Sequence, residues 1–342
     1  MSQFKTIFSG CLEFGNERSF FQVEKLFWHR TETYYRNDIL LKDEAFFDEA
    51  NNCFNIERFL TMSNLKSWRN TINLLEHIAE FAIAGHINAW RTEEGQMLET
   101  RLIEPQSDKA AVQAYLKGRD LIVQKGKEDE AMRSLNRAIE KFERHAMAYE
   151  RRGHVNLLLK NYKDAMYDFS KSIDIYPHNP EPYLGRAYLY QREGAYEKAI
   201  ADLTLATKCS IPHQPIYWEA RRKKAEYFLA INDFESAIKE LRLFIKRKFT
   251  SDNPNYKYRR PAFSALGRAL FETQQYKEAI QAFDTAMAID EQQATTTIPV
   301  ADQLFYRGMA RQKIGQKGYE ADLEEAADLG CTRAAKQLQA MA

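Results

Sequence analysis

The sequence predicts a mainly α-helical protein, in which a small α+β domain precedes an α-solenoid of five or six helical hairpins. Small residues recur in register through the second half of the chain, and such a repeat indicates stacked supersecondary units. The first hundred residues lack this repeat and contain short runs rich in Phe, Ile and Val. We therefore predict an α+β domain over residues 1–105 and a helical repeat domain over residues 106–342. The recurring small residues are Ala131, Ala165, Ala199, Ala237 and Ala279.

The N-terminal domain begins with aromatic and β-branched segments. Phe4–Phe14 and Phe20–Trp28 flank Gly15-Asn16-Glu17-Arg18 and predict a β-hairpin. Two further strands are predicted at Tyr35–Leu41 and Cys53–Leu60. An acidic helix near Asp43–Ala50 is expected between them.

A long helix is expected next, with Ser63 as its N-cap. Apolar residues from Leu65 to Ile83 recur at helical spacing, which supports this assignment. Ile87–Trp90 and Met97–Ile103 then predict a second hairpin, which ends at Pro105.

Each repeat of the second half predicts two helices. In the second unit, Tyr162, Ala165, Phe169 and Ser172 lie three to four residues apart and therefore share one face of the second helix. Another small residue lies twelve positions before the alanine, where a first helix would cross the second. The residues at that crossing position are Gly153, Ala187, Ala225 and Gly267.

These residues carry a resemblance to a known family. The 34-residue period and the series Tyr149, Gly153, Tyr162, Ala165, Phe169 and Pro177 resemble the tetratricopeptide repeat (TPR). Units of this kind begin near 111, 146, 180, 218 and 260, with a degenerate sixth from about 301 and a capping helix from Thr332. The linkers Lys246–Arg260 and Asp290–Ala301 are long, and spacing alone leaves open whether they fold over the groove or move.

The composition excludes several classes of protein. With 44% hydrophobic and 13% aromatic residues, the 342-residue chain can build a core and is not a disordered tail. The 49 Lys and Arg nearly balance the 48 Asp and Glu, so no global field attracts nucleic acid or an anionic membrane. Locally, residues 1–105 hold 11 basic and 16 acidic side chains, whereas residues 221–260 hold 12 basic and 5 acidic ones.

The cysteines and the apolar segments bear on localisation. Cys11, Cys53, Cys209 and Cys331 form no CxxC pair and no zinc-ligand spacing, so reduced, buried thiols are expected. No apolar run reaches 18 residues and the N-terminus lacks a secretory signal, so no membrane span is predicted. We expect a cytoplasmic protein.

No catalytic motif stands out. The sequence contains no HExxH, GxSxG, Walker or GxGxxG pattern. His77, Glu99 and Glu104 are interpreted as surface residues, although a paired-carboxylate site remains an alternative. We therefore expect no enzymatic activity, no cofactor and no metal site.

The TPR resemblance implies that the first helix of each hairpin lines a concave groove for a peptide or protein partner. Aromatic and Arg side chains are frequent anchors at such interfaces. A chaperone-tail clamp is not expected, because the Lys and Asn residues it requires are absent at the matching positions. The implied groove residues are Tyr115, Arg119, Glu150, His154, Leu157, Leu184, Tyr188, Arg192, Arg222, Glu226, Leu229, Arg268 and Phe271.

A basic stretch within residues 221–260 is a second candidate site. It could be solvated or paired within the chain, could hold an acidic protein, or could bind nucleic acid through cations interleaved with Tyr256 and Tyr258. Its basic residues are Arg221, Arg222, Lys223, Lys224, Lys246, Arg247, Lys248, Lys257, Arg259 and Arg260.

The sequence thus favours a non-enzymatic interaction scaffold with a TPR groove. One alternative is a nucleic-acid- or phosphate-binding adaptor that uses residues 221–260. Another is an enzyme or sensor of unrecognised type in residues 1–105. The identity of the partner and the oligomeric state are left open by the sequence.

Overall fold

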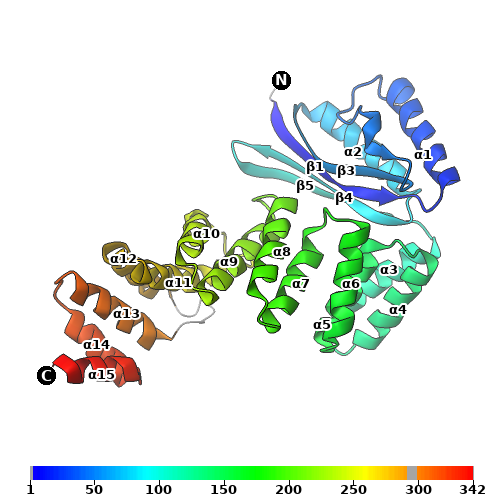
Figure 1. Cartoon of the computed structure of the whole chain (residues 1–342). Helices are drawn as coiled ribbons and strands as arrows, with labels where there is room; N and C mark the ends of the chain where they lie inside the picture. Colours follow the sequence, from blue (N-terminus) through cyan, green and yellow to red (C-terminus); the bar gives the residue numbers. More distant parts are fainter. Residues whose placement is uncertain (1–2, 291–298, 342) are drawn as a thin grey trace. The chain divides into compact units, whose positions relative to one another are not determined.

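The computed structural model describes residues 3–290 and 299–341 (Figure 1). Its contacts divide the chain into two compact units, Met1–Arg186 and Ala187–Ala342. The first unit contains a β-sheet together with the first helical hairpins. None of the helices in the described ranges combines the length and the apolarity that a membrane crossing requires.

Five antiparallel strands form one sheet in the order β2-β3-β1-β4-β5. Two helices, α1 (Glu17–His29) and α2 (Leu65–Ala79), contribute to the core on one face of it. Aromatic rings fill this core: Phe8 lies 5.5 Å from Trp68, and Phe27 lies 5.4 Å from Phe54, between ring centroids. The strands are β1 (Phe4–Glu13), β2 (Phe47–Asp48), β3 (Cys53–Ser63), β4 (Ala84–Glu93) and β5 (Gln96–Ile103).

The predicted hairpin of Phe4–Phe14 with Phe20–Trp28 is wrong in its second half, because that segment forms α1. The Asn16 side chain caps the helix by accepting a hydrogen bond from the Ser19 amide at 2.9 Å. Phe20, Val23 and Phe27 then recur at helical spacing and are all buried. The periodicity and the cap outweigh the strand preference of the aromatic residues.

The predicted strand Tyr35–Leu41 is also wrong. Its segment is irregular and is held against α2, where the Leu40 amide donates to Thr71 Oγ1 at 2.9 Å. The helix expected near Asp43–Ala50 is a single 3₁₀ turn, Glu44–Phe46, followed by β2. Asn64, and not Ser63, caps α2 by accepting from the Lys66 and Ser67 amides.

The predicted long helix is confirmed as α2, although it ends at Ala79 and does not reach Ile83. The remaining strand predictions are confirmed. Residues Cys53–Leu60 lie in β3, and the second predicted hairpin is formed by β4 and β5. Of the cysteines, Cys11, Cys53 and Cys331 are buried thiols, whereas Cys209 is half-buried.

The predicted helical hairpins are confirmed, including a sixth hairpin and a capping helix. Small loops separate the helices of each pair. The fourth and fifth hairpins are joined by a longer segment, in which Phe249 is buried against Phe244. The predicted linker Asp290–Ala301 lies mostly outside the described residues. The hairpin helices are α3 (Ala110–Ile122), α4 (Glu128–Lys141), α5 (Ala146–Leu158), α6 (Tyr162–Ile175), α7 (Pro180–Arg192), α8 (Tyr196–Cys209), α9 (Pro215–Ala230), α10 (Phe234–Lys246), α11 (Arg259–Glu272), α12 (Tyr276–Ala288), α13 (Val300–Lys313), α14 (Tyr319–Asp328), and the cap α15 (Thr332–Met341).

Glycine on one helix lies against phenylalanine on a neighbouring one. A Cβ added to Gly153 on α5 would lie 2.8 Å from the Phe169 ring on α6, and one added to Gly185 on α7 would lie 2.4 Å from the same ring. Gly267 on α11 faces Phe283 on α12 in the same way, at 2.8 Å. The missing side chain therefore makes room for the ring.

We predict that Gly153→Ala destabilises the protein. Alanine raises helix propensity by up to about 1 kcal/mol, but overpacking against a buried ring costs about 1–3 kcal/mol. Urea unfolding of Gly153→Ala, Phe169→Leu and the double variant measures the coupling between the two sites. The smaller leucine side chain of Phe169→Leu should relieve most of the penalty, and a Gly153→Ala protein as stable as the wild type would contradict this packing.

A second prediction concerns His145, the N-cap of α5. Its Nδ1 accepts a hydrogen bond from the Ala148 amide at 3.2 Å, and burial lowers its pKa from 6.5 to about 3. The unfolded chain gains a proton near pH 6.5 that the folded chain does not bind, so stability present above pH 6.5 is lost as the pH falls towards 3. Between pH 7 and 4 this loss amounts to about 3 kcal/mol.

The matched variant is His145→Asn, because Asn also caps helices but does not titrate in this range. We expect the free energy of unfolding in urea to fall further from pH 7 to pH 4 in the wild type than in the variant. Equal falls would show that His145 is not the group responsible.

Candidate partner-binding groove

The predicted groove residues all lie on the first helix of a hairpin. Tyr115 and Arg119 lie on α3, and Glu150, His154 and Leu157 lie on α5. Leu184, Tyr188 and Arg192 lie on α7, which contains the division between the two compact units. Arg222, Glu226 and Leu229 lie on α9, while Arg268 and Phe271 lie on α11.

On α3, the predicted groove residues contact the chain's own N-terminal part. Arg119 Nη1 donates to both carboxylate oxygens of Glu104, at 2.9 and 2.7 Å, just after β5 ends. The Tyr115 ring lies 4.7 Å from the His145 ring, and burial raises the pKa of Tyr115 to about 12. Tyr115 also packs beside the buried cluster of Cys11, Cys53, Ala146, Met147 and Tyr176, which joins the sheet to the hairpins.

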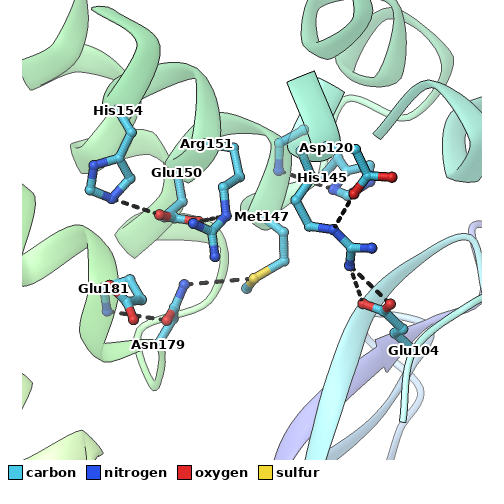
Figure 2. A network of polar contacts seen from close by, with 11 residues as sticks. Glu104, Asp120, His145, Met147, Glu150, Arg151, His154, Asn179 and Glu181 are labelled. Carbon is cyan, nitrogen blue, oxygen red and sulfur yellow. Dashed lines mark hydrogen bonds and ion pairs between the residues drawn. The ribbon is translucent and has the colours of Figure 1, made fainter. Parts of the chain in front are cut away.

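On α5, Glu150 is 1% exposed and its charge is balanced locally (Figure 2). Its carboxylate lies 2.8 Å from His154 Nε2 and 3.0 Å from Arg151 Nε. Burial opposes ionisation, but the charge of Arg151 and the contact with His154 lower the pKa of Glu150 overall. Burial likewise opposes the charged form of His154. The hydrogen bond and the negative charge of Glu150 more than offset this effect of burial, so the pKa of His154 is raised.

Glu150, His154 and Glu181 are the one group of His, Cys, Asp and Glu side chains within the described residues whose geometry could hold a metal ion. Their ligand atoms lie within 4.8 Å of one another. The chain itself already places a cation, Arg151, and an imidazole, His154, against the Glu150 carboxylate, at 3.0 and 2.8 Å.

In the second unit, α9 and α11 border a cavity of about 650 Å³. Four predicted groove residues line it, namely Arg222, Glu226, Leu229 and Arg268. Lys223, predicted as part of the basic stretch, also lines it. The other lining residues are Ala230, Asn232, Leu241, Tyr258, Pro261, Ala262 and Ala265. The floor is thus mainly apolar, with charged groups around it.

The cations at this cavity differ in their surroundings. Arg222 is 5% exposed, its guanidinium carbon lies 3.7 Å from the centroid of the Tyr258 ring, and its Nη1 lies 2.5 Å from Glu226 Oε1. Arg222 is therefore a wall of the cavity, held by a ring and a carboxylate. Lys223 is half-buried and Arg268 is exposed, and neither has an ion-pair partner in the part of the chain that the structure describes.

The basic stretch divides into a buried and an exposed group. Arg221 and Lys224 lie 2.5 and 2.6 Å from the two oxygens of Glu240 on α10. Arg260 is buried, and the Arg259 guanidinium stacks 3.7 Å above the Tyr256 ring. The exposed members are Lys246, Arg247, Lys248 and Lys257.

Tyr258 lies within the basic stretch of the sequence, and nothing in the sequence indicates that it lines the cavity. It belongs to the 3₁₀ turn Tyr256–Tyr258 in the linker before α11, outside the repeat register. The 42-residue separation of Ala237 and Ala279 signals an inserted segment, but it does not tell where that segment packs.

The chain was compared with known proteins. Models of the tetratricopeptide repeat match residues 109–180, which contain α3–α6, and residues 261–293, which contain most of α11 and all of α12. Among solved structures, PilF of Pseudomonas aeruginosa is 15% identical, with a TM-score of 0.50, over 69% of this chain and 99% of that chain. YrrB, described as a TPR protein with an unusual peptide-binding site, is 15% identical, with a TM-score of 0.49, over 59% of this chain and 97% of that one.

The search of curated proteins found no match to this sequence. The likeness to PilF concerns the fold alone. The two family-model matches agree with the repeat positions predicted from the Gly, aromatic and Ala residues. The chain therefore contains tetratricopeptide repeats, at residues 109–180 and 261–293.

Proposed function

We propose that this protein is a non-enzymatic interaction scaffold whose cavity between α9 and α11 binds a peptide segment that carries a carboxylate beside an apolar side chain. The carrying observation is the combination of an apolar floor with two cations, Lys223 and Arg268, that have no ion-pair partner among the described residues. The 650 Å³ volume falls in the size range of binding pockets.

The floor of the cavity supports the first part of the proposal, that the bound peptide carries an apolar side chain. Leu241 is a buried residue of α10, and Ala262 and Ala265 are buried on α11. Small residues on α11 leave a depression that an aliphatic side chain would fill, with the loss of apolar surface from water as the driving force. Leu229 is half-buried and continues this surface on α9.

The charged residues at the cavity support the second part of the proposal, that the bound peptide carries a carboxylate. Glu226 is paired with Arg222, so its negative charge is offset within the chain. Arg268 on α11 and Lys223 on α9 then leave an excess of positive charge at the cavity. A guanidinium can take a carboxylate through two parallel hydrogen bonds, which gives the contact direction as well as energy.

A random peptide library displayed on phage tests this proposal. We expect selected peptides to place Asp or Glu next to Leu, Ile or Val. Arg268→Glu should weaken their binding, measured by fluorescence polarisation, at least tenfold, or about 1.4 kcal/mol. Leu229→Arg should weaken it similarly, because it introduces a charge into the apolar floor.

Lys277→Glu is the matched control, since Lys277 is an exposed cation on α12 that does not line the cavity. Peptide affinity that survives Arg268→Glu and Leu229→Arg would refute the proposed site.

The nucleic-acid alternative now rests on the exposed Lys246, Arg247, Lys248 and Lys257. A pull-down from lysate with and without nuclease separates it from the peptide proposal. Material that vanishes with nuclease, and that Lys246→Glu/Lys248→Glu no longer retains, would favour the adaptor.

A further inference from the structure

Strand β5 is an edge strand of the sheet that the described residues form (Figure 1). It pairs with β4 on one side, and its residues Leu98 and Leu102 are 45% and 55% exposed. Backbone amide and carbonyl groups along such an edge can pair with another strand. An eight-residue edge with two exposed leucines is therefore a surface on which a further strand can dock.

The side chains of β5 are arranged symmetrically about Thr100, with leucines at equal distances and opposite charges on either side. Leu98 and Leu102 lie two positions on either side of it, and Glu99 and Arg101 lie next to it. If β5 of a second copy pairs antiparallel with a twofold axis at Thr100, each Leu98 lies opposite a Leu102. Each Glu99 then lies opposite an Arg101, so both the apolar and the charged pairs are complementary.

The side chains are placed for such pairing. Glu99 is fixed on the α2 side of the sheet by Trp68 Nε1, which donates to its Oε2 at 3.2 Å, and by Arg91 at 3.1 Å. Arg101, whose side chain is 54% exposed, reaches Glu99 of its own strand at 2.8 Å. In a paired edge, the fixed Glu99 carboxylate can also accept from Arg101 of the second copy.

From this arrangement we infer that two copies of the chain associate through β5, with antiparallel strands related by a twofold axis at Thr100. The two five-stranded sheets become one continuous sheet, and an isologous interface of this kind closes after two subunits. A β-bulge, marked by the register shift opposite Arg91 and Thr92, lies at Leu98, so Leu98 is at the end of the proposed pairing, which the axis at Thr100 centres on residues 98–102.

The other edge of the sheet lacks this symmetry. Beyond its short pairing with β2, strand β3 presents Leu60 and Met62, which are 51% and 54% exposed. Its charged neighbours Glu57 and Arg58 are adjacent and have no mirrored counterparts along the strand. The β3 edge therefore supplies matched control positions for the β5 edge.

The first test is the mass in solution by sedimentation velocity over a concentration series. We expect wild-type protein to approach twice 39.9 kDa as the concentration rises. Leu98→Lys/Leu102→Lys should stay at the monomer mass, because like charges then face each other across the axis. Leu60→Lys/Met62→Lys should dimerise as the wild type does, and circular dichroism shows that each variant is folded.

The second test addresses the register. Thr100→Cys places two thiols at the axis, where directly opposed Cβ atoms lie about 4.5–5.5 Å apart, a spacing close to that of a disulfide. Mild oxidation with diamide should cross-link this variant between copies much faster than Met62→Cys or the wild type.

Three results would overturn the inference. One is a wild-type mass of 39.9 kDa at every concentration. The same mass would be found if β5 pairs only with a strand of a different protein. Another is a dimer that persists in Leu98→Lys/Leu102→Lys. The third is a Thr100→Cys protein that cross-links no faster than Met62→Cys.

Discussion

The contact between a bulky apolar side chain on one helix and a small residue on its neighbour is the constraint on which the helical hairpins depend. The Phe169 ring lies against Gly153 and Gly185, and Phe283 lies against Gly267, at distances that a Cβ would not tolerate. The distance between neighbouring helices is therefore set by the contact of the glycine backbone with the phenylalanine ring, and neither of these groups can deform readily. The same packing reaches the cavity, because Leu241 is both a core residue of α10 and part of the cavity floor.

Charge compensation divides the predicted groove residues into those paired within the chain and those without an ion-pair partner among the described residues. Arg119 forms an ion pair with Glu104. Glu150 lies against Arg151 and His154. Arg222 stacks on the Tyr258 ring and pairs with Glu226. A charge that is removed from water must be paired inside the protein, and each of these charged groups lies against a group of opposite charge in the chain itself. The exposed Arg268 and the half-buried Lys223 give the cavity its positive character.

The helical hairpins were predictable because several repeats agree in register. Each helix shows the same small and large positions, and a helix period of 3.6 residues converts them directly into a buried face. In the N-terminal part each segment occurs only once, so no second copy confirms a prediction made from its local pattern. Local patterns predict its strands β1, β3, β4 and β5, but they also predict a strand where α1 forms, because Phe20, Phe27 and Trp28 suit a sheet as well. The Asn16 cap was the signal that could have corrected this.

By itself, the sequence determined the repeat, the helix pairs, the glycine positions that the crossings require and the symmetric chemistry of β5. All of these are properties of neighbouring residues or of residues at a fixed period. The tertiary structure alone decided that Glu104 meets Arg119, that Tyr258 covers Arg222 and that β5 lies at the edge of the sheet. Pairing of this kind depends on which surfaces the packed elements bring together, and no local pattern in the chain encodes it.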